Sequence, residues 1–214
     1  SAISGATRAV LSFASVTAAD AGSYDLVATG GGTSVTSLSA SLVVSGEPIP
    51  LVPTGAQTAL IPLVSGGEFR GRVEVGPFST AGYGAVWGQP SIAGTTITVD
   101  AQLTAPPPGA VVPQVVQTLT NEYILGQLAP GSYQFVFEAW GQTVKTVSFS
   151  VFSLGTGVTP AGSGSISLTP SPVATNRFLG GTSVSLVATP ASGYSFIGWN
   201  DGNTNNPRQV VVSA

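Results

Sequence analysis

The sequence contains no histidine, no cysteine and no methionine. These absences exclude Ser-His-Asp and Cys-His catalytic groups, disulfides, zinc sites built from His or Cys, and the usual haem ligands. Only 7% of the residues are charged, and the net charge is −3. A charge this weak excludes binding of nucleic acid through a basic surface. We therefore expect a protein with no catalytic residues, no metal site and no cofactor, and not an enzyme.

Long apolar runs are also absent. No segment reaches the ~18 consecutive apolar residues of a membrane helix, so we expect no membrane span, and no retained signal peptide is recognisable. The chain does not begin with methionine, which suggests a processed chain or a segment of a longer one. Its polar residues are mainly Ser, Thr, Gly, Asn and Gln, a composition compatible with an extracellular or cell-surface location.

Apolar residues and turn formers are abundant. Hydrophobic residues make up 43% of the 214 residues, and 28 Gly and 16 Pro favour many short strands joined by turns. Apolar and polar residues alternate with period two, which predicts an all-β protein with almost no helix. The clearest predicted strands cover residues 9–13, 23–28, 34–44, 68–75, 95–103, 132–138, 144–151, 165–169, 183–189 and 210–213.

Two short stretches rich in Gly and Pro interrupt this pattern, at residues 46–50 and 155–164. Such stretches are typical of semi-rigid linkers between domains. We therefore predict three tandem modules, over residues 1–46, 47–155 and 160–214.

The first module carries a tyrosine-corner pattern, in which Asp20 and Gly22 shape a turn before Tyr24. On this pattern, residues 8–45 resemble the second half of an immunoglobulin-like domain of the I-set type. The resemblance implies strands E, F and G of a β-sandwich, with Leu26 where the family often has a cysteine. The remaining strands would come from sequence outside this chain or from a neighbouring copy.

A half sandwich would leave an apolar face and open strand edges uncovered. The inward-facing residues of that face, and hence the predicted self-association residues, are Leu11, Phe13, Val16 and Leu26. If a neighbouring copy covers this face in a head-to-tail contact, the protein forms fibres.

The third module contains an apolar strand at 181–190, the pattern Gly-Tyr-x-Phe-x-Gly-Trp at 193–199, and an Asp-Gly-rich hairpin at 201–208. In this order the segments make residues 164–214 resemble an internalin B-repeat module of bacterial surface proteins. We expect the aromatic pattern to form a strand, with Tyr194, Phe196 and Trp199 in a small core. Because the family usually continues with a further apolar strand, we expect that the module is truncated at Ala214. Asp201 and the following Asn residues favour a turn over a calcium loop.

The second module, which we interpret as a β-sandwich, has a Pro-Gly turn at 130–131 followed by a predicted hairpin. Its candidate ligand-binding residues are Tyr83 and Trp87, which lie in a Gly-rich loop and either stack against a sugar or fill the end of the core. The single lysine, Lys145, is interpreted as an ordinary strand residue, with an isopeptide bond assisted by Glu138 as the alternative.

Together these features favour a non-catalytic structural or adhesive module array of a bacterial cell-surface or secreted protein. Its partners would be other β modules of the same or a neighbouring chain, and it would act as a spacer or a self-associating unit. The alternative is a carbohydrate-binding accessory region with glycan partners, which depends on exposed, coplanar rings of Tyr83, Trp87 and Trp140.

Overall fold

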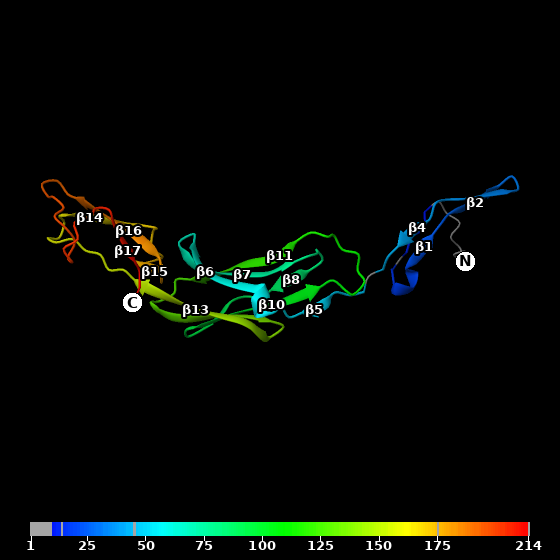
Figure 1. Ribbon diagram of the computed structural model, residues 1–214, viewed down its shortest axis with the longest axis horizontal. Helices are drawn as coiled ribbons and strands as arrows, with labels where there is room; N and C mark the ends of the chain where they lie inside the picture. The colour runs from blue at the N-terminus through cyan, green and yellow to red at the C-terminus, as the bar shows by residue number, and fades with distance from the viewer. Residues whose placement is uncertain (1–9, 14, 45, 175, 214) are drawn as a thin grey trace.

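The computed structural model describes residues 10–13, 15–44, 46–174 and 176–213. In this part of the chain the helical elements are two 3-10 turns, η1 (Ala18–Asp20) and η2 (Gly55–Gln57), and strands account for the rest of the regular structure. The predicted all-β class is confirmed. The strands form three groups that follow one another along the longest axis, from blue through green to red in Figure 1.

The first group consists of two small antiparallel ribbons. β1 (Gly22–Tyr24) pairs with β4 (Ala40–Leu42), and β2 (Val27–Gly30) pairs with β3 (Thr33–Thr36). The predicted strand over residues 9–13 is wrong for 10–13, and Ala9 lies outside the described residues. Residues 10–13 form no strand because β1 is paired with β4 alone, so this segment has no ladder partner.

The second group is a sandwich of two sheets. One sheet has the order β13-β12-β10-β5, with β8 and β9 also paired to β10, and the other has the order β11-β7-β6. The strands are β5 (Ile49–Leu51), β6 (Thr58–Ser65), β7 (Glu68–Phe78), β8 (Gly84–Trp87), β9 (Ser91–Ala93), β10 (Thr96–Ala105), β11 (Gln117–Gly126), β12 (Gly131–Ala139) and β13 (Gln142–Ser153). The predicted hairpin is present as β12 and β13.

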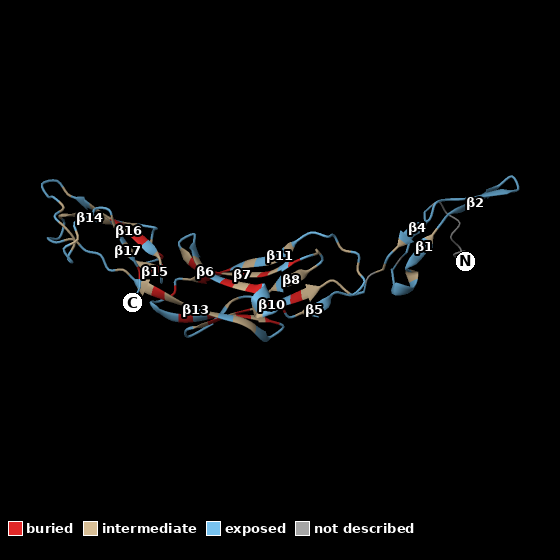
Figure 2. Ribbon diagram, in the orientation of Figure 1, coloured by how far each residue is buried: buried red, intermediate tan, exposed pale blue. Residues whose placement is uncertain are grey.

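The main core lies between these two sheets. Alternate residues of β7 and β12 point inward, so Phe69 and Val73 face Phe135 and Phe137, and each of the four is at most 1% exposed. Figure 2 shows that the buried residues gather along the strands of this sandwich, whereas the first group carries no buried colour. Burial of this apolar surface is the main stabilising term, at about 25 cal/mol per Å².

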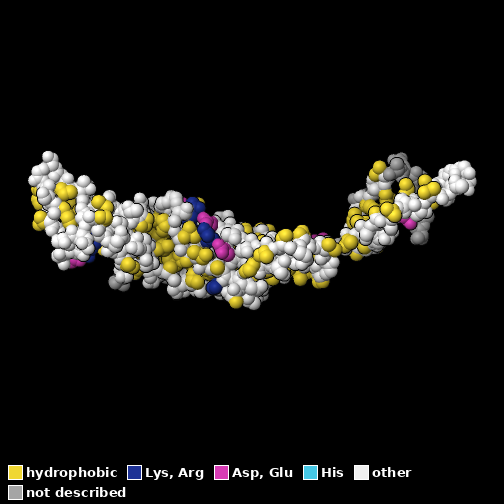
Figure 3. Space-filling model, turned by 45° about the horizontal axis from the view of Figure 1, so that its top comes forward, with side chains coloured by type: hydrophobic (Ala, Val, Ile, Leu, Met, Phe, Trp, Pro, Cys, Tyr) yellow, Lys and Arg dark blue, Asp and Glu magenta, His cyan; other side chains and the backbone are white. Residues whose placement is uncertain are grey.

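The outer face of the sheet formed by β11, β7 and β6 is charged, as the alternation in β7 predicts. Arg72 donates to Glu122 of β11 at 2.9 Å and lies 3.5 Å from Glu74. Hydrogen bonds and the negative charge of Glu122 raise the pKa of Arg72 above its ordinary value. Figure 3 shows a short row of basic (blue) and acidic (magenta) side chains on the surface of the second group. Because these ion pairs are open to solvent, which screens them, they contribute little to stability.

The third group is a small antiparallel sheet of order β14-β16-β17, formed by β14 (Gly164–Thr169), β16 (Ser183–Pro190) and β17 (Arg208–Val211). The predicted strand at 193–199 is wrong, because this segment lies in the loop between β16 and β17. Side chains hold the loop instead. The Trp199 indole N–H donates to the carbonyl of Asn205 at 2.8 Å, and the Asn206 amide accepts from the Ala188 N–H at 2.9 Å and donates to the Ala188 carbonyl.

The core of this third sheet also differs from the prediction. Its buried residues are Phe178, Val184, Leu186 and Val212. Trp199 packs against this cluster with partial burial, whereas Tyr194 is 51% exposed. Tyr194 stays outside the core because the loop that carries it does not pair with the sheet.

Candidate functional site

The candidate functional site is the junction between the second and third groups, where strands pair and side chains pack across the boundary. After β13 leaves the sandwich, the chain turns back and adds β15 (Arg177–Leu179) to it as an edge strand. β15 pairs antiparallel with the last residues of β13, and Phe152 lies opposite Phe178. β15 thus belongs to the sandwich sheet, although the segments on either side of it lead to β14 and β16.

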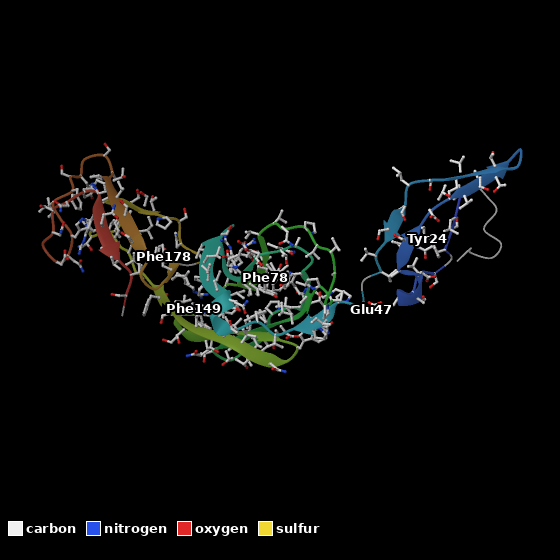
Figure 4. The ribbon with its side chains drawn as sticks, turned by 45° about the vertical axis from the view of Figure 1, so that its right-hand side comes forward. Tyr24, Glu47, Phe78, Phe149 and Phe178 are labelled. Carbon is white, nitrogen blue, oxygen red and sulfur yellow. The ribbon has the colours of Figure 1, made fainter. Side chains whose placement is uncertain are left out.

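The two hydrophobic cores exchange side chains at this junction. Val173, which is 1% exposed, belongs to the sandwich core, and Leu179 packs against the same core. In return, Phe152 and Leu154 pack against the core of the third group, around Phe178. Figure 4 shows Phe178 at the start of the third group and Phe149 on β13. Neither core is complete without residues from the other side of the junction.

Polar groups at the junction are paired as well. The Arg177 guanidinium donates to the carbonyl of Leu128 at 3.1 Å, in the turn that precedes β12. The backbone N–H of Leu154 donates to the carbonyl of Asn176, and the N–H of Gly180 donates to the carbonyl of Ser150, both at 2.8 Å. Charge-assisted and backbone hydrogen bonds of this kind fix the relative orientation of the elements that they join.

The predicted ligand residues Tyr83 and Trp87 both pack against the sandwich core. The ring of Tyr83 stacks on Phe78 with centroids 3.8 Å apart and planes 10° apart. Trp87 contacts Tyr123 edge-on at 6.5 Å and Phe137 at 6.3 Å. Phe78 thus covers one face of the Tyr83 ring, and both rings are partly buried against the core, so the geometry favours the core-filling interpretation.

Trp140 lies in the turn between β12 and β13 with φ of 53°, and Gly141 follows with φ of 70°. Left-handed values at two successive residues are typical of the type I′ hairpin turn. The Trp140 indole N–H donates to the carbonyl of Leu103 at 2.8 Å, which anchors the ring along β10. This anchoring gives the partly exposed ring a structural role.

The tyrosine-corner residues lie together in the first group. The Tyr24 hydroxyl donates to the carbonyl of Asp20 at 2.5 Å, and Gly22, which lies between these two residues, begins β1. The Asp20 carboxylate accepts from the N–H and the hydroxyl of Thr17, and these hydrogen bonds lower the pKa of Asp20.

A second corner of the same form, which sequence analysis missed, occurs at Tyr133. Its hydroxyl donates to the carbonyl of Ala129, again four residues earlier, at 2.9 Å. The shared tripeptide Gly-Ser-Tyr, at 22–24 and 131–133, is the signal that could have revealed it.

The predicted self-association residues are all exposed. Leu11 is 42%, Phe13 37%, Val16 49% and Leu26 59% exposed. Phe13 lies edge-on to Tyr24 at 5.9 Å, but among residues 10–13 and 15–44 no residue is buried. Other apolar residues in this part are even more open, including Leu38 at 96%.

The third group contains a groove of about 820 Å³ between the segment after β13 and the loop before β17. Tyr194, Phe196 and Trp199 line it together with small polar residues. Arg208, which also lines the groove, donates two hydrogen bonds from its guanidinium to the Asp201 carboxylate, the shorter at 2.5 Å, and these lower the pKa of Asp201. Asp201 therefore has its charge neutralised by Arg208. In the part of the chain that the structure describes, no cluster of His, Cys, Asp or Glu could hold a metal ion.

Lys145 does not reach Glu138. Its ammonium donates to the carbonyls of Gly55 at 3.0 Å and Thr58 at 2.5 Å, whereas Glu138 accepts from the Thr143 hydroxyl. The alternative of an isopeptide bond assisted by Glu138 thus has no geometric support.

Comparison with known families finds one match in the third part of the chain. Residues 154–213 match the sequence model of a family described as a divergent InlB B-repeat domain. The predicted B-repeat resemblance is therefore confirmed, and the match begins at Leu154, ten residues before the predicted start. The immunoglobulin-like resemblance of residues 8–45 is not confirmed and stays a prediction. No curated protein and no solved structure matches the chain. Over the described residues, no helix is long and apolar enough to span a bilayer.

Proposed function

We propose that this chain is a non-catalytic structural segment of a bacterial cell-surface or secreted protein, in which the second and third modules form one stiff spacer. The observation that carries the proposal is the β13–β15 junction, where the cores interlock and strands pair across the boundary. A flexible linker would let the modules reorient, whereas shared strands and shared cores oppose such motion. The B-repeat match supports the surface setting.

Distances between spin labels test this stiffness directly, because the chain has no cysteine and single Cys substitutions label cleanly. Thr146 on β13 and Ser167 on β14 are both exposed. Labels at Thr146→Cys and Ser167→Cys are expected to give a narrow distance distribution. The matched pair Ser34→Cys and Thr146→Cys spans the linker around Glu47, where no strand pairing crosses, and is expected to give a broad one. Equally broad distributions would refute the stiff spacer.

We assign the first module the adhesive, self-associating part of this function. Its two ribbons are too small to be stable alone, and their apolar residues are exposed. Another β module covering this face would complete it. The full chain is expected to scatter light as an oligomer, and a version lacking residues 1–46 is expected to be monomeric. A monomeric full chain would overturn this assignment.

The second candidate function is glycan binding, for which the groove in the third module is a better site than Tyr83 and Trp87, the latter being the last residue of β8. The groove presents the half-exposed ring of Tyr194 beside hydroxyl and amide groups, a combination typical of sugar sites. Binding on a glycan array that Tyr194→Ala abolishes would support it. Binding that only Tyr83→Ala abolishes would instead support the site at Tyr83.

A further inference from the structure

Tension applied to the two ends of the second module runs along its strands. β10 and β12 are parallel, while β5 is antiparallel to β10 and β13 is antiparallel to β12. The incoming strand β5 and the outgoing strand β13 therefore point in the same direction. The chain arrives beside the end of β10 and departs beside the start of β12, so it enters and leaves at opposite ends of the sheet (Figure 1).

This arrangement places the backbone hydrogen bonds in shear. Hydrogen bonds of a sheet lie across the strands, so a force along the strands loads the bonds of a ladder together. A force across the strands would instead open them one after another. The ladders between β10 and β12 and between β12 and β13 are long, with six and nine residue pairs.

The attachment of β5 is the weak point of this path. It comprises three residue pairs, and its middle residue, Pro50, has no N–H to donate. Once β5 detaches, the load passes to the segment that follows, which contains η2 and the start of β6.

Lys145 ties that segment directly to the outgoing strand. It lies near the start of β13, and its ammonium donates to the carbonyls of Gly55, the first residue of η2, and Thr58, the first residue of β6. Gly55 also lies against β13, because a Cβ added there would be 3.3 Å from the carbonyl oxygen of Val144. Thr58 is 2% exposed, and its hydroxyl donates to the carbonyl of Thr54, which fixes the turn.

We propose that the second module is a load-bearing unit in which Lys145 is a latch between the incoming segment and the outgoing strand. The proposal rests on the spacer function, since a spacer between anchored and adhesive parts transmits force. Hydrogen bonds from an ammonium to two carbonyls are stronger than neutral ones, and here they join the two loaded segments directly. This role accounts for the partly buried position of Lys145, where its stem lies against the protein and its ammonium reaches two carbonyls.

Single-molecule force spectroscopy on the full chain, held by its two ends, tests the latch. The roughly 100 residues between β5 and β13 release on the order of 350 Å at about 3.5 Å each, which identifies the unfolding of this module. Lys145→Met removes the ammonium and keeps an unbranched apolar side chain. It is expected to lower the peak unfolding force at every pulling speed.

Arg72→Met is the matched control. It also replaces a cation by methionine, but Arg72 joins β7 to β11, which lie off the path between the two ends. Its peak force is expected to equal that of the wild type. Equal forces for wild type and Lys145→Met, or an equal fall in both variants, would overturn the latch.

Two further measurements complete the test. If Lys145→Met does not fold, Lys145→Gln provides the same comparison, because the amide is neutral and shorter than the lysine side chain, and a lower peak force is again expected. The spin-label distances across the β13–β15 junction do not depend on Lys145. A narrow distribution with unchanged forces refutes the latch alone, whereas a broad distribution refutes the spacer function itself.

Discussion

Replacement of Gly71 by alanine should destabilise the second module, because an aromatic ring of the opposite sheet fills the space that the new Cβ would need. Gly71 is an inward-facing residue of β7, and the ring of Phe135 on β12 lies directly over it. A Cβ at this position would be 2.5 Å from Cζ of Phe135 and 2.9 Å from Cε1. Real Cβ atoms do not approach other atoms this closely, so the ring or the backbone must move.

The ring has little room to move, since Phe135 is 0% exposed. Overpacking of a dense core costs about 1–3 kcal/mol. Alanine also reduces the freedom of the unfolded chain, which offsets about 0.4–1 kcal/mol of that cost. We therefore expect Gly71→Ala to lower the free energy of unfolding by about 1–2 kcal/mol.

Urea denaturation followed by tryptophan fluorescence measures this change, because Trp87 and Trp140 both lie in the second module. Gly155→Ala is the control, since nothing lies within 4 Å of a Cβ at that residue. Phe135→Leu should leave space for the new methyl group, so the double variant is expected to lose less stability than the two single changes added together. A fully additive double variant, or an unchanged Gly71→Ala, would refute the reasoning.

Three further outcomes are expected. Tyr123→Phe should leave stability unchanged or raise it by up to about 1 kcal/mol in urea denaturation, because the buried Tyr123 hydroxyl has no partner with good hydrogen-bond geometry among the described residues and interacts only weakly with the Asn121 side chain; a clear loss of stability would show that the interaction with Asn121 matters. The pKa of Asp201 is lowered by Arg208, so the stabilisation from this pair is present above the ordinary Asp pKa and is lost as the pH falls through the lower folded value; acid titration of Trp199 fluorescence should show this loosening, and Asp201→Asn should abolish it. Asn206→Ala removes both hydrogen bonds to the Ala188 backbone and should speed hydrogen exchange at the end of β16, and unchanged exchange would contradict this.

Four strands of the second module, β7, β10, β12 and β13, could be predicted from sequence because alternation decides which face of a strand is buried, whereas β5, β6, β8, β9 and β11 were not predicted. The pattern of Phe69, Val73 and Val75 against Arg70 and Arg72 appears unchanged in the structure as an inner and an outer face. The strand β6 was not predicted because Pro62 interrupts its apolar pattern. The strand tolerates this proline because it lies at the edge of its sheet, where one side of the ladder is unpaired.

Loops and short strands depended on contacts that alternation does not encode. The aromatic pattern at 193–199 reads as a strand, yet this segment is a loop, and the Asn206 side chain, which follows it in the chain, bonds to the backbone of β16 at Ala188. The conspicuous aromatic loop around Tyr83 and Trp87 looks like a binding surface in sequence. Whether such rings face a ligand or a core is decided by the residues that surround them, here Phe78, Tyr123 and Phe137.

The sequence alone determined the all-β class, the position of the B-repeat module and the tyrosine corner at Tyr24, because each depends on local spacing. Tertiary structure decided how the modules are joined. Residues 155–164 read as a linker from their Gly and Pro content, but the chain folds back beyond them and pairs β15 with β13. β15 has only three residues, too few for their alternation to predict a strand, and its partner residues in β13 lie more than twenty positions earlier in the chain. Only the free energy gained by merging two cores and satisfying the edge of β13 specifies that contact.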